Sequence, residues 1–135
     1  LITDMPEVIT AQKELEKLQK TYSTDIQNTV KEFQVKQQTY AADAPNQTEI
    51  TNQARAEELQ SMQQNIQKFE QTAAQDLQKK QKDMMTPLIE KARAAIEIVA
   101  AAQGFDYVLD STPGGFVIMA KGKDLLEDVK KELGF

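Results

Sequence analysis

The side chains best suited to chemistry gather in one short stretch near the carboxyl end of the sequence. Asp106 and Asp110 lie four residues apart, and a pair of carboxylates can act as general acid and general base. Residues 111–115 (STPGG) could serve as a glycine-rich phosphate loop. That loop lacks the lysine and the following helix of a P-loop, so a turn is the better interpretation. We interpret the two aspartates as solvated strand residues, because no pocket is predicted around them.

The rest of the composition excludes most catalytic chemistry. The 135 residues contain no histidine, cysteine or tryptophan. Zinc sites of the Cys/His type, thiol chemistry, disulfides and triads with a histidine base therefore cannot form. We expect neither an enzyme nor a bound metal or other cofactor. A chain without cysteine is compatible with an oxidising compartment but does not identify one.

Charge and hydropathy narrow the choice of partners. The net charge is -5, which disfavours a nucleic-acid-binding module, since such modules usually have basic surfaces. The longest apolar stretch, residues 94–102, contains Glu97 and falls well short of the ~20 residues of a membrane span. The sequence begins at Leu1 without a methionine or a signal-peptide pattern, so we expect a processed product whose signal peptide has been removed.

A basic cluster of Lys79, Lys80 and Lys82 interrupts this acidic background. Such a cluster could bind anionic lipid or an acidic partner, so a transient contact with a membrane surface remains an alternative. A solvated helix face is the simpler interpretation of these lysines.

Apolar periodicity predicts two long helices. Apolar residues recur mostly every three or four positions from Val8 to Tyr40, which is typical of an amphipathic helix. Asp4 and Glu7 have the spacing of a capping box at its start. Residues 42–48 contain Pro45, which disfavours helix in the residue before it, so a tip turn is predicted there.

The second helix is predicted over residues 47–103, with a capping box of Asn46 and Glu49 at its start and a kink near Pro87. Its apolar stripe has coiled-coil spacing, so the two helices should pack as an antiparallel hairpin along one seam. Beyond Pro87 a second apolar stripe appears beside the first, which indicates a wider core. The predicted seam residues are Leu15, Leu18, Tyr22, Val30, Phe33, Leu59, Ile66 and Phe69.

Residues 104–135 differ in kind from the hairpin of residues 1–103. Residues 105–110 and 116–120 have strand patterns, and Asp124 should cap a last amphipathic helix. The fold class is therefore mainly α, with a small α/β head from which the helical hairpin projects. Two strands alone are marginal in water, so we expect further strands from upstream of Leu1 or from other copies of the chain.

Several segments in this order resemble one family. They are Met5-Pro6-Glu7, residues 11–15 (AQKEL), residues 75–81 (QDLQKKQ), residues 86–89 (TPLI), residues 104–110 (GFDYVLD) and Gly114-Gly115. The chain resembles the Skp (OmpH-like) family of periplasmic outer-membrane-protein chaperones over essentially its whole length. The resemblance implies a homotrimer in which a β-containing body holds three helical tentacles around a cavity. It also implies a periplasmic holdase that keeps unfolded outer-membrane β-barrel proteins from aggregating without ATP.

Two sets of residues are candidates for these roles. Apolar residues on or near the tentacle surface are the candidate client contacts, although scattered surface residues need no functional explanation. These are Ile9, Val35, Ile50 and Met62. The candidate oligomerisation residues are Met85, Ile89, Ile96, Tyr107, Leu109, Phe116, Val117, Ile118 and Met119.

A second function remains open for a helical hairpin. The chain could be a structural or adaptor coiled coil that bridges folded partners. An adaptor would bind one folded partner, whereas a holdase would suppress the aggregation of an unfolded barrel protein. A single aggregation measurement therefore distinguishes the two hypotheses.

Overall fold

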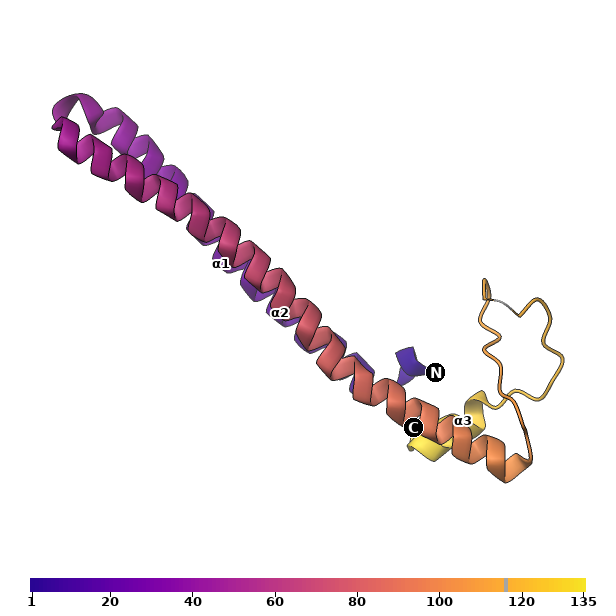
Figure 1. Ribbon diagram of the computed structural model, residues 1–135. Helices are drawn as coiled ribbons and strands as arrows, with labels where there is room; N and C mark the ends of the chain where they lie inside the picture. The colour runs from indigo at the N-terminus through magenta and orange to yellow at the C-terminus, as the bar shows by residue number, and fades with distance from the viewer. Residues whose placement is uncertain (116) are drawn as a thin grey trace. The chain divides into compact units, whose positions relative to one another are not determined.

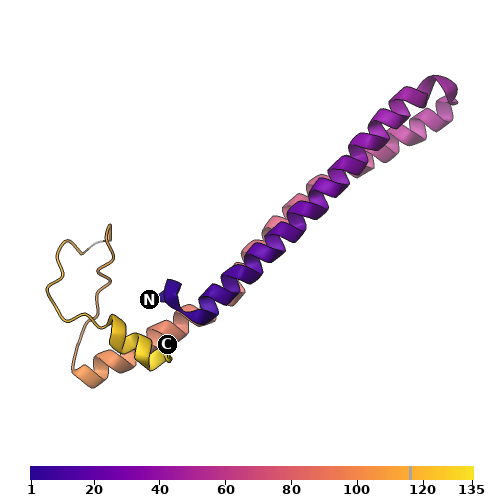
Figure 2. The same cartoon turned by 180° about the vertical axis from the view of Figure 1, so that it is seen from behind.

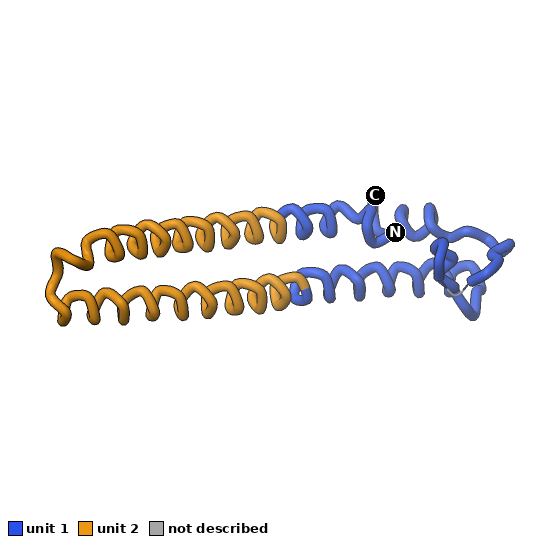
Figure 3. The backbone as a smooth tube through the Cα atoms, turned by 90° about the horizontal axis from the view of Figure 1, so that it is seen from above, with its two compact units in different colours: residues 1–13, 82–135 blue, residues 14–81 orange. Residues whose placement is uncertain are grey.

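The computed structural model describes residues 1–115 and 117–135 and is mainly helical (Figures 1 and 2). The elements, in chain order, are the short 3-10 helix η1 (Ile2–Asp4), α1 (Pro6–Asp43), the 3-10 helix η2 (Ala44–Asn46), α2 (Glu49–Gln103) and α3 (Leu126–Leu133). The chain forms two compact units (Figure 3). Unit 1 contains residues 1–13 and 82–135, and unit 2 contains residues 14–81.

Unit 2 is an antiparallel helical hairpin, as predicted. The parts of α1 and α2 within this unit lie side by side, and η2 reverses the chain between them (Figure 1). The Gln47 amide donates to the Ala44 carbonyl at 3.2 Å, which closes the turn. Pro45 lies in the first turn of η2, where its missing N–H leaves no bond unmade.

The cap of α2 differs from the prediction. The Thr51 amide donates to the Thr48 hydroxyl at 3.2 Å, so Thr48 caps the helix in place of Asn46. The Asn46 side chain instead donates to the Asp43 carboxylate at 3.5 Å. Threonine is a good cap residue, because its hydroxyl oxygen can accept the hydrogen bond of a free amide in the first turn. The helix therefore begins at Glu49, two residues later than expected.

The start of α1 also differs from the predicted capping box. Both carboxylates of that box pair with lysines of unit 1: Asp4 Oδ2 lies 3.1 Å from Lys130 Nζ, and Glu7 Oε1 lies 2.5 Å from Lys91 Nζ. The helix begins at Pro6, a residue that suits the first helical position. Long-range ion pairs have replaced the local cap at this end.

Unit 1 has a small core in two clusters. One contains Met5, Val8 and Ala92, and their side chains are at most 1% exposed. The other contains Ala95, Val99, Leu125 and Val129, and Leu1 and Leu133 pack against both clusters. Alanines on α2 leave room for α3 and for the start of α1 to pack closely against it. The predicted second apolar stripe after Pro87 therefore serves a wider core.

Local backbone geometry ends α2 and precedes α3. Gly104 has a φ of +74°, a left-handed conformation that favours glycine, and the Phe105 amide donates to the Ala100 carbonyl at 3.0 Å. The predicted cap of the last helix is wrong, because Leu125 is the N-cap residue of α3 and makes no side-chain cap hydrogen bond. The Asp124 carboxylate, one residue earlier, accepts a hydrogen bond from the Leu126 amide at 2.9 Å. Helix α2 continues through Pro87.

Residues 105–115 and 117–124 are irregular, and no strand forms among the described residues. The predicted strands at 105–110 and 116–120 are therefore not formed in the isolated chain, and Phe116 lies outside the described residues. Two short strands cannot hold together without further strands or a covering helix. The β-containing part of the predicted fold is not seen in residues 1–115 and 117–135.

Candidate functional site

The two aspartates considered for catalysis are surface residues. Both are exposed, and the Asp110 carboxylate accepts hydrogen bonds from the Thr112 hydroxyl and from the Thr112 amide at 2.9 Å. These hydrogen bonds hold the pKa of Asp110 below its ordinary value of 3.8, which favours the charged form. Asp110 thus stabilises the turn of residues 111–115, in which the Gly115 amide donates to the Thr112 carbonyl at 3.0 Å. Residues 111–115 therefore contain a turn, as we expected from the sequence.

The structure also bears on metal binding, on the basic cluster and on a membrane span. Among the described residues, no three acidic side chains are placed to hold a metal ion together. Lys79, Lys80 and Lys82 are all exposed on α2, the first two in unit 2 and the third in unit 1. Within the described part of the chain, no helix combines the length and the hydropathy of a membrane span.

The predicted seam residues lie between the helices of unit 2 with only partial cover. All of them are half-buried except Phe69, of which 39% is exposed. The Phe69 ring meets Tyr22 edge-on, with 6.1 Å between ring centroids and 87° between the ring planes. Ala73 is the only buried residue of unit 2. A two-helix seam covers each side chain from one side only, so this unit has little buried core.

Tyrosine–carboxylate pairs join the two helices of unit 2. The Tyr22 hydroxyl donates to Asp76 Oδ2 at 2.6 Å, and the Tyr40 hydroxyl donates to Glu58 Oε2 at 2.6 Å. Each carboxylate raises the pKa of its tyrosine partner, because the hydrogen bond stabilises the neutral phenol. Both pairs have the same antiparallel register and therefore fix the alignment of the helices.

The tip of unit 2 is held by a polar cluster. The Arg55 guanidinium carbon lies 4.6 Å from the centroid of the Tyr40 ring, and its Nη1 lies 3.0 Å from Asp43 Oδ2. Lys36 Nζ lies 2.5 Å from Glu58 Oε1. Hydrogen bonding from Lys36, and then from Tyr40, lowers the pKa of Glu58. Hydrogen bonding from Arg55 lowers the pKa of Asp43. The tip is therefore stabilised by paired charges more than by apolar burial.

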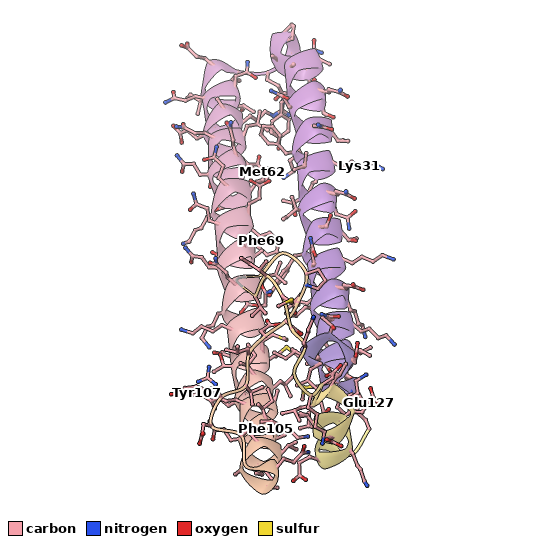
Figure 4. All side chains as sticks on the ribbon, turned by 90° about the vertical axis from the view of Figure 1, so that its right-hand side faces the viewer. Lys31, Met62, Phe69, Phe105, Tyr107 and Glu127 are labelled. Atoms are coloured by element: carbon pink, nitrogen blue, oxygen red, sulfur yellow. The ribbon has the colours of Figure 1, made fainter. Side chains whose placement is uncertain are left out.

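The four candidate client contacts are dispersed. Ile9 belongs to unit 1 and is 40% exposed, whereas Val35 and Ile50 belong to unit 2 and are 54% and 83% exposed. Met62 is half-buried on α2 (Figure 4). The register set by the tyrosine pairs brings Val35 and Met62 to the same level of the hairpin, while Ile50 lies in the first turn of α2. The three residues of unit 2 therefore do not form one patch.

The candidate oligomerisation residues divide into two groups. Met85 and Ile96 pack against the core of unit 1, Ile89 beside them is 41% exposed, and Val117 is half-buried. The side chains in the irregular segment are largely in water, as Figure 4 shows for Tyr107. Their exposed fractions are 85% for Tyr107, 72% for Leu109, 101% for Ile118 and 70% for Met119. Phe116 lies outside the described residues.

Comparison with known proteins identifies the family. Residues 1–133 match the family described as outer membrane protein (OmpH-like). The chain belongs to the OmpH-like family. A search among curated proteins found no match. Membership of the OmpH-like family suggests a chaperone role toward outer-membrane proteins, and it agrees with the helical hairpin of unit 2.

Sequence reasoning missed several residues of this OmpH-like chain. Met5 is 0% exposed and anchors the core of unit 1, and Ile98 on α2 is 54% exposed. Asp76 and Glu58 were not recognised as partners of seam tyrosines. The available signal was the position of Tyr22 and Tyr40 on the apolar stripe, because a half-buried phenol needs a hydrogen-bond partner.

Proposed function

We propose that this chain is an ATP-independent holdase chaperone of the periplasm, which binds unfolded outer-membrane β-barrel proteins and prevents their aggregation. The observation that carries the proposal is the family match over residues 1–133. The hairpin of unit 2 supports it, because one half-buried seam leaves most of the helical surface free to meet another chain.

Client binding in this proposal depends on many weak contacts. The exposed Ile9, Val35 and Ile50, with the half-buried Met62, are the proposed apolar contacts. Each contributes about a kcal/mol or less, and their sum holds a client without fixing one geometry. Their dispersion supports this mode of binding, since no single pocket has to be filled. A client held in this way stays mobile and can be released without ATP.

Assembly as a homotrimer completes the proposed molecule. Residues 1–103 form the tentacle, and residues 104–135 contribute to the shared body. The high exposure of Tyr107, Leu109, Ile118 and Met119 supports this role, because exposed apolar side chains in an irregular segment favour pairing with another chain. Strands would form at 105–110 and 116–120 once the copies pair their strand edges with one another. Ile89 and Ile96 on α2, with Met85, would then pack beneath the shared strands.

An aggregation assay tests the proposal. An outer-membrane barrel protein, unfolded in urea, is diluted into buffer with increasing amounts of the chain, and light scattering is recorded. We expect scattering to be suppressed at a near-stoichiometric ratio of chaperone trimer to client. Unchanged aggregation with the chain in excess would contradict the holdase function. Binding to one folded partner, with aggregation unaffected, would favour the adaptor function instead.

A further inference from the structure

One side of α2 in unit 2 consists almost entirely of glutamine. At 100° per residue, glutamines recur there in steps of three and four, which keeps them on one face of the helix. Ala74 is the only other residue on this face between its two ends. All of these side chains are exposed. We call this face the glutamine stripe, and its members are Gln60, Gln63, Gln64, Gln67, Gln71, Gln75 and Gln78.

The glutamine stripe lies on the side of α2 turned away from the seam. Seam residues such as Ile66 and Phe69 lie more than a quarter turn from the centre of the stripe on the helical wheel. Charged residues, including Lys68 and Glu70, flank the stripe but do not interrupt it. A solvated face in a chain with 27% charged residues would ordinarily include lysine and glutamate. The stripe is therefore a continuous uncharged surface.

Some glutamine and asparagine amides elsewhere in the chain form internal hydrogen bonds. Gln47 donates to Asp43 at 2.7 Å, Asn52 donates to the Ala44 carbonyl at 2.9 Å, and Gln103 donates to Asp128 at 2.7 Å. The amides of the stripe, by contrast, make no hydrogen bond to any described residue. They stabilise neither the turn nor the hairpin, and they remain available to a ligand.

A side-chain amide offers the same groups as a peptide bond, N–H donors and a carbonyl acceptor. The stripe runs about 27 Å from Gln60 to Gln78 at the rise of an α-helix. An extended strand of about eight residues has this length. Unfolded β-barrel segments expose unpaired N–H and C=O groups along their edges. The stripe thus matches an extended backbone in both hydrogen-bonding chemistry and length.

We infer that the glutamine stripe is a binding surface for the extended, unpaired backbone of an unfolded client, and that it accepts client segments whatever their charge. The inference rests on the proposed holdase function and adds the class of ligand and the place of contact. Peptide groups are common to every client, so a surface that binds them does not depend on the sequence of the client. A second copy of the chain could also use an amide row, and the experiment below separates that occupant from a client.

The test compares two sets of four Gln→Ala substitutions in the full chain. The stripe variant changes Gln60, Gln64, Gln67 and Gln71. The control variant changes Gln19, Gln27, Gln34 and Gln38, which are equally exposed on α1 but mostly two turns apart. Alanine favours helix, so both variants keep the hairpin, which circular dichroism verifies. The probe is a urea-unfolded, dye-labelled outer-membrane barrel protein, and the Kd is measured by fluorescence anisotropy.

We expect the stripe variant to bind the probe at least about fivefold more weakly than the wild type, and the control variant to stay within about twofold. The ratio between stripe variant and wild type should change less than about twofold between about 50 mM and 500 mM salt, because screening acts on charges and not on amide pairs. A large change of this ratio with salt would contradict a charge-independent surface.

The remaining outcomes separate the inference from the proposed function. If the wild type binds the probe and the stripe variant binds it equally well, the inference is wrong while the holdase function stands. If the stripe variant loses copies from its assembly, as measured by light scattering, the stripe is a contact between copies and the inference is wrong. If the wild type fails to bind the probe, the holdase function and the inference fail together.

Discussion

The Tyr22 hydroxyl donates a hydrogen bond of 2.6 Å to the Asp76 carboxylate across the hairpin of unit 2. Tyr40 and Glu58 repeat this arrangement nearer the tip with the same distance. Apolar packing along a narrow seam resists sliding only weakly, because successive turns present similar surfaces. A directional bond to a charged acceptor has one correct partner, so these pairs specify the register of the helices.

The Tyr22 pair can be tested by removing only its hydroxyl. Tyr22→Phe keeps the edge-on contact with Phe69 but loses the hydrogen bond, so we expect a small decrease in Tm. Tyr22→Ala removes the ring as well and should lower the Tm further. Thermal unfolding followed by circular dichroism measures both changes. Equal Tm values for the wild type and both variants would show that this pair does not stabilise the hairpin.

Acid should weaken the tip of unit 2. The pKa of Glu58 lies below its ordinary value of 4.5 because Lys36 and Tyr40 donate to the carboxylate. A carboxyl group with a depressed pKa in the folded state contributes stability above its unfolded pKa, and that stability is lost as the pH falls through the folded value. We therefore expect the Tm difference between the wild type and Glu58→Gln to be constant above about pH 5 and to shrink below about pH 4.5. A difference that grows in acid would contradict the pairing.

The core of unit 1 should be sensitive to truncation. Val129 is 2% exposed and Met5 is 0% exposed. Val129→Ala should lower the free energy of unfolding by about 2 kcal/mol, and Met5→Ala by about 3 kcal/mol, because each leaves a cavity. Val35→Ala, at a side chain that is 54% exposed, serves as the control and should change the value by less than about 0.5 kcal/mol. Urea denaturation followed by circular dichroism gives the three values, and equal losses at all three positions would place the core elsewhere.

The irregular segment should be required for assembly but not for the fold of one chain. Ile118 is 101% exposed, so Ile118→Asp breaks no contact within the chain. We expect helix content to be unchanged and the molar mass from light scattering to fall toward that of a single chain. Lys121→Asp, at another exposed position, is the control for added negative charge. An Ile118→Asp protein with the mass of the wild type would show that this side chain is not part of the interface.

The helical part of the fold could be predicted from the sequence because its signals are local. The apolar period predicts α1 and α2, Pro45 marks the turn between them, and Gly104 follows the end of α2. The caps were predicted less well. Asn46 and Thr48 are both residue types that cap helices, and in the structure Thr48 accepts the hydrogen bond of the Thr51 amide. That choice depends on the turn geometry, which the sequence does not reveal.

The remaining differences come from contacts between distant residues. The strand patterns at 105–110 and 116–120 predict strands that need partner strands, and no strand forms among residues 1–115 and 117–135. The partners of Tyr22 and Tyr40 depend on the register of two helices joined by a turn of uncertain length. The glutamine stripe, in contrast, is visible in the sequence, and the structure adds that its amides are exposed and unused within the described chain.

The central claim is that three copies of this chain together hold one unfolded outer-membrane barrel protein. Native mass spectrometry of the full chain, mixed with such a barrel protein diluted from urea, measures this directly. We expect a complex of three copies with one client, and a free trimer when the client is left out. Single copies of the chain beside aggregated client would contradict it.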